Sequence, residues 1–439
     1  MTFTEDQITA LAPDASSLKA GRDLALPAKW QLKGYSANAL WGHCQGSGKL
    51  PYQTQVDLQN IAFKCSCPSR KFPCKHGLGL LFMYTRHKDL FTAGPEPDWV
   101  EDWLRKRTEK TEKKAEQKDK PVDTEAQAKR TEARTKKVAD GVEDLQFWIK
   151  DLIRNGLLTV PENATTFWQN PAKRMVDAQA TGLAALVKSL DSINYYNDSW
   201  KYELLNRLLK IYTVGEAFKH IDTIPDELAA EVKNQIGFTQ PKEEVLQQTG
   251  IADTWLVLCR NYTDDEQLTI ERNWLYGTTS GKYAMVLQFI APNQVPEVNL
   301  MPGQYLEAEL VFYKGANNYR ALVKKQQSAA AITIPQGLPS LTEAFRIFSE
   351  VICINPFHER VPVMLNKGRF IKNDGYYISD SEGYAAQVHC TDDMAWKILA
   401  ITGGEPFTLS MLINESGAEP LALWANEKFY AIASNAVKK

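Results

Sequence analysis

The chain has 439 residues, of which 44 % are hydrophobic and 24 % charged, with a formal net charge of −2. This length exceeds one ordinary core, so we expect several domains. The nearly neutral charge confines any affinity for nucleic acid to a local patch, and no apolar run approaches the ~18 residues of a membrane-spanning helix.

The amino terminus, MTFTEDQITALAPD, is acidic and lacks the basic and apolar segments of a secretory signal. We therefore expect a cytoplasmic protein with no membrane partner. In a reducing compartment, closely spaced cysteines indicate metal binding rather than disulfides. Four of the seven cysteines are isolated, and we interpret them as small buried side chains: Cys44, Cys259, Cys353 and Cys390.

The first hundred residues contain the cysteine cluster between two predicted elements. Residues 50–64 are predicted to be extended, because apolar and polar side chains alternate from Tyr52 to Leu58 as in a half-buried strand. Residues 77–90 are predicted to form a short apolar helix. From Arg105 to Asp140 large apolar residues almost disappear, which indicates either a tether or a solvated helix interrupted at Pro121.

Helical periodicity begins at residue 142. Three segments show the spacing of a buried helix face: Val142, Leu145, Ile149, Leu152 and Ile153; Leu183, Leu186, Val187, Leu190 and Ile193; and Leu204, Leu205, Leu208 and Leu209. The expected core aromatics of this region are Trp148, Phe167, Trp168 and Trp200.

From about residue 250 the pattern changes to short strands joined by turns. Hairpins are predicted at 315–318, 373–375 and 425–427, and a helix at 340–352. The sequence therefore predicts an α+β, multi-domain protein with these parts: a zinc finger of β-β-α type (1–100), a charged linker (101–140), a helical domain (141–245), and two antiparallel β-rich modules (246–335 and 336–439).

The strongest motif is C-x-C-x6-C-x-H, formed by Cys65, Cys67, Cys74 and His76. Three thiolates and one imidazole are an accepted ligand set for tetrahedral zinc. Cys65 and Cys67 share one face if they lie in a strand, and Cys74 and His76 stand at a helix start, where free backbone N–H groups favour thiolates. Four protein ligands leave no open position, so we expect one structural Zn²⁺ that folds an otherwise coreless N-terminal unit.

This motif, with a strand before it and an apolar helix after it, resembles the SWIM zinc finger of bacterial proteins of about this length. The resemblance implies a finger that binds DNA or mediates protein contacts. It also implies a multiprotein system with a MoxR-type AAA+ ATPase and a von Willebrand A-domain (VWA) protein. Neither the identity of the partner nor the oligomeric state follows from it.

Residues 61–90 carry six basic side chains and one acidic one. The basic residues are candidates for nucleic-acid contact: Lys64, Arg70, Lys71, Lys75, Arg86 and Lys88. The alternative is that they offset the negative charge of a Cys3His zinc site and keep a small domain in solution.

The chain shows no P-loop, dinucleotide-binding fingerprint, H-E-x-x-H or G-x-S-x-G motif. We therefore expect an adaptor or scaffold whose finger mediates protein contacts. A DNA- or RNA-binding protein that uses the basic finger is the alternative. An enzymatic module in the C-terminal region comes third.

Overall fold

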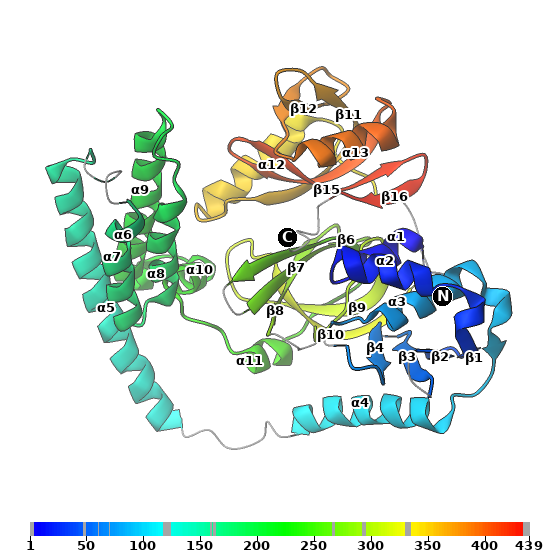
Figure 1. Cartoon of the computed structure of the whole chain (residues 1–439). Helices are drawn as coiled ribbons and strands as arrows, with labels where there is room; N and C mark the ends of the chain where they lie inside the picture. The colour runs from blue at the N-terminus through cyan, green and yellow to red at the C-terminus, as the bar shows by residue number, and fades with distance from the viewer. Residues whose placement is uncertain are drawn as a thin grey trace.

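The computed structural model describes residues 4–46, 50–59, 61–69, 71–116, 124–158, 160, 164–265, 268–291, 296–329 and 335–432. Its described elements form a finger domain, a helical bundle, a β-barrel and a C-terminal domain (Figure 1). This is the α+β, multi-domain fold that the sequence predicts. No helix among the described residues is long and apolar enough to cross a membrane.

The finger domain is built on a sheet whose described strands have the order β4-β3-β2-β1-β5. Helix α3 packs on one face of it, and Gly79 of α3 lets α2 cross closely, because a Cβ there would lie 2.9 Å from Leu24 Cβ. The elements are α1 (Glu5–Ala10), α2 (Ala15–Leu24), a 3-10 turn (Pro27–Lys29), β1 (Trp30–Tyr35), β2 (Ala39–Cys44), β3 (Tyr52–Asp57), β4 (Ala62–Cys65), α3 (Lys75–Arg86), a 3-10 turn (Lys88–Leu90), β5 (Thr92–Ala93) and α4 (Asp98–Glu116).

The structure divides the extended stretch predicted at 50–64 into the antiparallel strands β3 and β4. Over residues 54–57, strand β3 is buried on both faces rather than half-buried, because α4 covers its second face. Asp57 pairs with Arg107 of α4 at 3.4 Å, and Gln55 donates to the carbonyl of Trp99 at 3.4 Å. The start of the range predicted as a linker therefore packs on the finger sheet.

The described residues in the rest of the 101–140 range are helical. This agrees with the second of our two interpretations, the solvated helix. Helix α5 starts before residue 141 and contributes Val138 to the bundle core, while Pro121 lies outside the described residues. The bundle comprises α5 (Thr124–Asn155), α6 (Ala164–Phe167), α7 (Gln169–Asp177), α8 (Thr181–Lys188), a 3-10 helix (Ser189–Ser192), α9 (Trp200–Lys219), a 3-10 helix (Ile221–Thr223) and α10 (Asp226–Ile236).

The predicted aromatic core of the bundle is confirmed. Trp168 and Trp200 are buried, and Trp148 and Phe167 pack against Trp168. The prediction of the buried faces is wrong at three positions that are exposed: Ile153, Leu205 and Leu209. Their neighbours Leu152, Leu204 and Leu208 fill the core instead.

The third part is a closed barrel in which the described strands have the order β10-β8-β7-β6-β9. Strand β8 pairs in parallel with β10, and every other pair is antiparallel. This connectivity is that of the OB fold. The elements are α11 (Lys242–Gln247), which packs on the barrel, β6 (Ile251–Asp265), β7 (Leu268–Gly277), β8 (Tyr283–Ile290), β9 (Tyr305–Phe312) and β10 (Arg320–Ser328).

The C-terminal domain contains a sheet with the described order β13-β12-β11-β14-β15-β16 and two helices packed against its core. The hairpins predicted at 315–318, 373–375 and 425–427 and the helix predicted at 340–352 are all confirmed. The elements are α12 (Leu341–Ile354), β11 (Val361–Lys372), β12 (Tyr376–Ser379), β13 (Ala385–Gln387), α13 (Asp392–Thr402), β14 (Phe407–Asn414), β15 (Gly417–Ala425) and β16 (Lys428–Ala431).

The segment after α12 joins three of these parts. Phe357 is buried in the bundle core, and Glu359 forms an ion pair with Lys210 of α9. Between them, His358 Nε2 lies 2.8 Å from the carbonyl oxygen of Asn317 in the β9–β10 turn. The bundle is therefore held against the barrel and the C-terminal domain by direct contacts.

Candidate metal centre

The four predicted zinc ligands come from a hairpin end and a helix start. Cys65 is the last residue of β4 and pairs across the sheet with Thr54. Cys74 occupies the N-cap position of α3, and His76 lies in its first turn, as the sequence predicts. Cys67 differs from expectation: it lies past the end of β4 in the following bend, so the chain turns Cys67 toward the others without a shared strand face.

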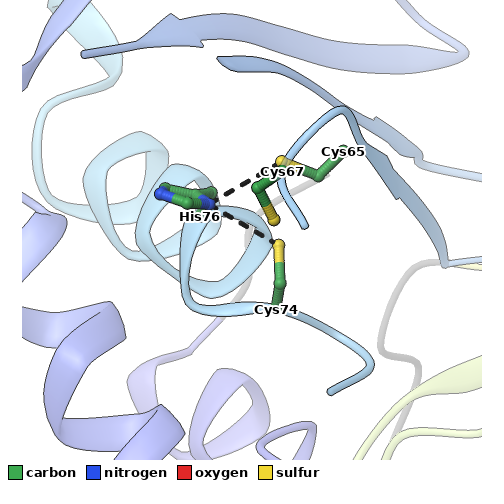
Figure 2. A group of neighbouring side chains, drawn as sticks. All are labelled: Cys65, Cys67, Cys74 and His76. Atoms are coloured by element: carbon green, nitrogen blue, oxygen red, sulfur yellow. Dashed lines mark hydrogen bonds between the residues drawn. The ribbon is translucent and has the colours of Figure 1, made fainter. Parts of the chain in front are cut away.

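The ligand atoms of these residues all lie within 4.8 Å of one another. His76 Nδ1 is 3.7 Å from Cys65 Sγ and 3.9 Å from Cys74 Sγ. Figure 2 shows the three sulfur atoms and the imidazole converging on one point. A tetrahedron with Zn–S bonds of about 2.3 Å has edges of about 3.8 Å, so the arrangement fits a single Zn²⁺.

Backbone groups support the charge of each sulfur. The N–H groups of Cys67, Ser69 and Gly77 donate to Cys65, Cys67 and Cys74 respectively. Hydrogen bonding to Cys65, with help from His76 and the Gly77 N–H, lowers the pKa of Cys74 to about 4. The same contact with Cys74, together with burial, raises the pKa of Cys65. Zinc binding therefore has to displace the proton of Cys65.

Two side chains of β3 complete the surroundings of the site. The hydroxyl of Thr54 lies 3.2 Å from Cys65 Sγ, where it donates once the thiol is deprotonated. The ring centre of Tyr52 lies 4.9 Å from that of His76, so the two rings pack against each other. The sequence reveals Tyr52 and Thr54 only as one face of a strand, because their role depends on the pairing of β3 with β4.

Comparison with known protein families identifies the type of this metal centre. The SWIM zinc finger family matches residues 52–84, which span β3, β4, the four ligands and most of α3. The chain contains a SWIM zinc finger. No curated protein and no solved structure matches the chain in the corresponding searches.

A second match extends the SWIM assignment beyond the finger. The SWIM-associated four-helix bundle domain matches residues 133–236, which correspond to the bundle from within α5 to the end of α10. The chain therefore contains a SWIM finger and its associated helical bundle, followed by the barrel and the C-terminal domain.

The SWIM finger of this chain has a substantial apolar core of its own. Leu78, Leu80 and Leu81 of α3 are completely buried, next to Phe82 and Met83. A Cβ on Gly77 would lie 2.7 Å from Phe63 Cδ1, so α3 lies directly on β4. The expectation that zinc folds an otherwise coreless unit is therefore wrong. The metal instead ties one loop to a packed domain.

The basic residues of the SWIM finger are not one uniform surface. Arg70 lies outside the described residues. Lys71 pairs with Asp14 at 2.8 Å, and Arg86 contacts Glu5 through two bonds of 2.7 and 2.8 Å. Lys88 lies over the rings of Tyr35 and Tyr84. Lys64 and Lys75 are exposed, and no ion pair to either is found among the described residues.

Proposed function

We propose that this protein is an adaptor in which the SWIM finger and the parts that follow it contact other proteins. Four protein ligands close the metal centre, so zinc serves structure and has no position for substrate. The barrel and the bundle contact the rest of the chain directly, which favours a scaffold that holds several surfaces in fixed relation.

The observation that carries this proposal is that the chain's own residues engage three of the six basic side chains of the finger. Lys71 and Arg86 of the finger are held by Asp14 and Glu5. Lys88 rests on two tyrosine rings. A cation can contact a phosphate only if its side chain is free. Phosphate binding by Lys71, Arg86 or Lys88 would therefore first break its contact within the chain.

The barrel supports the same reasoning. OB folds bind oligonucleotides on the outer face of their second and third strands, where aromatic side chains stack on bases. Here Trp274 on that face is buried in a core shared with Leu412, Leu421 and Trp424 of the C-terminal domain. The aromatic platform therefore stabilises a contact between domains of one chain.

The partner system that the SWIM resemblance suggests, a MoxR-type AAA+ ATPase with a VWA-domain protein, forms part of this proposal. We expect the zinc-loaded full chain to bind one of these proteins in calorimetric titration and analytical ultracentrifugation. In parallel, fluorescence anisotropy with labelled single- and double-stranded DNA and RNA, at low and near-physiological salt, tests the alternative. Micromolar binding that weakens with salt and disappears in the Lys64→Glu/Lys75→Glu variant would favour a nucleic-acid-binding function over the adaptor function.

A further inference from the structure

Five exposed side chains of α5 and α9, three of which the sequence predicts to be buried, gather on one side of the helical bundle. On α9, Tyr202, Leu205 and Leu209 are 71 %, 45 % and 60 % exposed. Their spacing of three and four residues places them along one face of the helix, away from the core face of Leu204 and Leu208. On α5, Phe147 and Ile153 are 58 % and 46 % exposed.

Contacts between α5 and α9 bring these side chains together. Gln146 donates to the carbonyl of Tyr212 at 3.2 Å, and a Cβ on Gly215 would meet both Gln146 and Val142. Residue numbers thus rise along α5 as they fall along α9, so the two helices are antiparallel. Two helical turns from the Gln146–Tyr212 contact, this antiparallel register places Ile153 at the level of Leu205. We call the surface formed by these five side chains the α5–α9 face: Phe147, Ile153, Tyr202, Leu205 and Leu209.

The charges around the α5–α9 face are uneven. Lys150 lies in its middle, 5.9 Å from the ring centre of Phe147 and 5.4 Å from that of Tyr212. Lys201 lies toward one end, beside Trp200. Among the described residues neither lysine forms an ion pair.

Two acidic groups adjacent to these lysines in the sequence are paired with arginines instead. Asp151 pairs with Arg154 at 3.4 Å, and Glu203 pairs with Arg207 at 2.6 Å. Glu143 stands one turn before Phe147, outside the face. The apolar surface therefore presents two cations that have no acidic partner within the part of the chain that the structure describes.

We propose that the α5–α9 face binds an amphipathic helix of a partner protein, with leucine-type side chains on the apolar surface and a carboxylate opposite Lys150. This deepens the proposed adaptor function and rests on it. Helices recognise such surfaces through anchors at i, i+3 or i+4, and i+7, and a partly desolvated carboxylate–lysine pair adds specificity. A second copy of the chain fits less well, because a twofold axis through the face would bring one Lys150 onto the other.

The test uses the zinc-loaded full chain and a labelled helical peptide of about 20 residues. The probe carries leucines at i, i+3 and i+7 flanked by glutamates, and a second peptide replaces the glutamates by lysines. We expect anisotropy to show about tenfold tighter binding of the acidic peptide. Leu209→Glu weakens it at least about tenfold by placing a charge in the apolar contact. Lys150→Glu reverses the preference between the peptides.

Val176→Glu is the matched control, because Val176 is 53 % exposed in the same bundle but on α7. It is expected to leave peptide binding unchanged, with zinc content and circular dichroism equal in all variants. Equal binding of both peptides, or no effect of Leu209→Glu, overturns the proposal. Two other results also overturn the proposal, because they assign the face to another occupant. One is that the chain forms a dimer that Leu209→Glu dissociates. The other is that the chain binds anionic lipid vesicles and Leu209→Glu abolishes this binding.

The ATPase and VWA-protein titrations separate this proposal from the adaptor function. If those proteins bind Leu209→Glu as tightly as the unaltered chain, the adaptor function stands and the assignment of the α5–α9 face fails. If they do not bind the unaltered chain, while the acidic peptide binds and the variants behave as expected, the face stands and that partner system fails.

Discussion

The side-chain amide of Asn299 donates a hydrogen bond of 2.6 Å to the backbone carbonyl of Ile61 and so connects the barrel to the SWIM finger. Ile61 occupies the turn between β3 and β4 with a φ of +40°, a few residues before the first zinc ligand. The oxygen of the same amide accepts from Arg260 of β6 at 3.0 Å. Met301, two residues on, is buried in the finger core. The finger and the barrel are therefore joined next to the metal centre.

Replacing Asn299 by alanine is expected to weaken this junction. The change leaves the Ile61 carbonyl without its donor and removes an acceptor of the buried Arg260, which costs about 1–3 kcal/mol. Urea unfolding should show the finger transition at lower concentration, with faster hydrogen exchange at residues 58–63. Asn206→Ala, at an exposed position of α9, should change neither. Equal effects of both substitutions would contradict the assigned role of Asn299.

Zinc removal is expected to release the loop between the ligands without unfolding the finger domain. The domain keeps the apolar core around α3, so chelation should accelerate hydrogen exchange at residues 65–76 while β1, β2 and the later turns of α3 stay protected. Cys74→Ser should reproduce this state and reduce the zinc content from about one ion per chain to near zero. Cys353→Ser, at an exposed cysteine outside the finger, should keep its zinc. Cooperative loss of the whole domain on chelation would contradict this expectation.

Zinc retention should depend on pH in one direction. The metal requires three thiolates and a neutral His76, so protons compete with it and apparent affinity falls as pH falls. The pKa of Cys74 already lies well below that of an ordinary thiol, while burial and the contact with Cys74 raise that of Cys65. Titration with a chromogenic chelator should therefore show zinc release that increases as the pH falls. Release that is independent of pH would exclude this ligand set.

Gly79→Val is expected to destabilise the finger domain by separating α2 from α3. A Cβ at Gly79 would lie 2.9 Å from Leu24 Cβ and 3.2 Å from the carbonyl oxygen of Gly21, so the helices must move apart. Overpacking of this kind costs about 1–3 kcal/mol, measurable as a lower thermal midpoint. Gly94→Val meets nothing within 4 Å and serves as the control. A midpoint shift no larger than that of the control would argue against the close crossing.

Phe357→Ala is expected to loosen the bundle from the rest of the chain. The ring is buried in the bundle core although the residue belongs to the segment between α12 and β11. Losing it should cost about 3–5 kcal/mol at this contact. Small-angle scattering should report a larger radius of gyration, and proteolysis near residues 355–360 should accelerate. Phe289→Ala, at an exposed ring on β8, should leave both measurements unchanged.

The sequence by itself determines the metal centre and the local elements. All four zinc ligands fall within twelve residues, 65–76, so spacing and ligand chemistry suffice to find them. The hairpins at 373–375 and 425–427 can also be predicted from the sequence alone, because a turn depends on a few neighbouring residues. The buried aromatics Trp168 and Trp200 follow from helical periodicity combined with side-chain size.

Tertiary structure decides what depends on partners distant in sequence. The barrel closes through the pairing of β6 with β9 and of β8 with β10, and no local pattern encodes those registers. Lys71 and Arg86 find Asp14 and Glu5 only because α1 and α2 pack on α3. Leu204 and Leu205 have the same chemistry, but the packing of α9 buries the first and exposes the second. Periodicity identifies an apolar helix, whereas the arrangement of the neighbouring helices decides which of its side chains remain available to a partner.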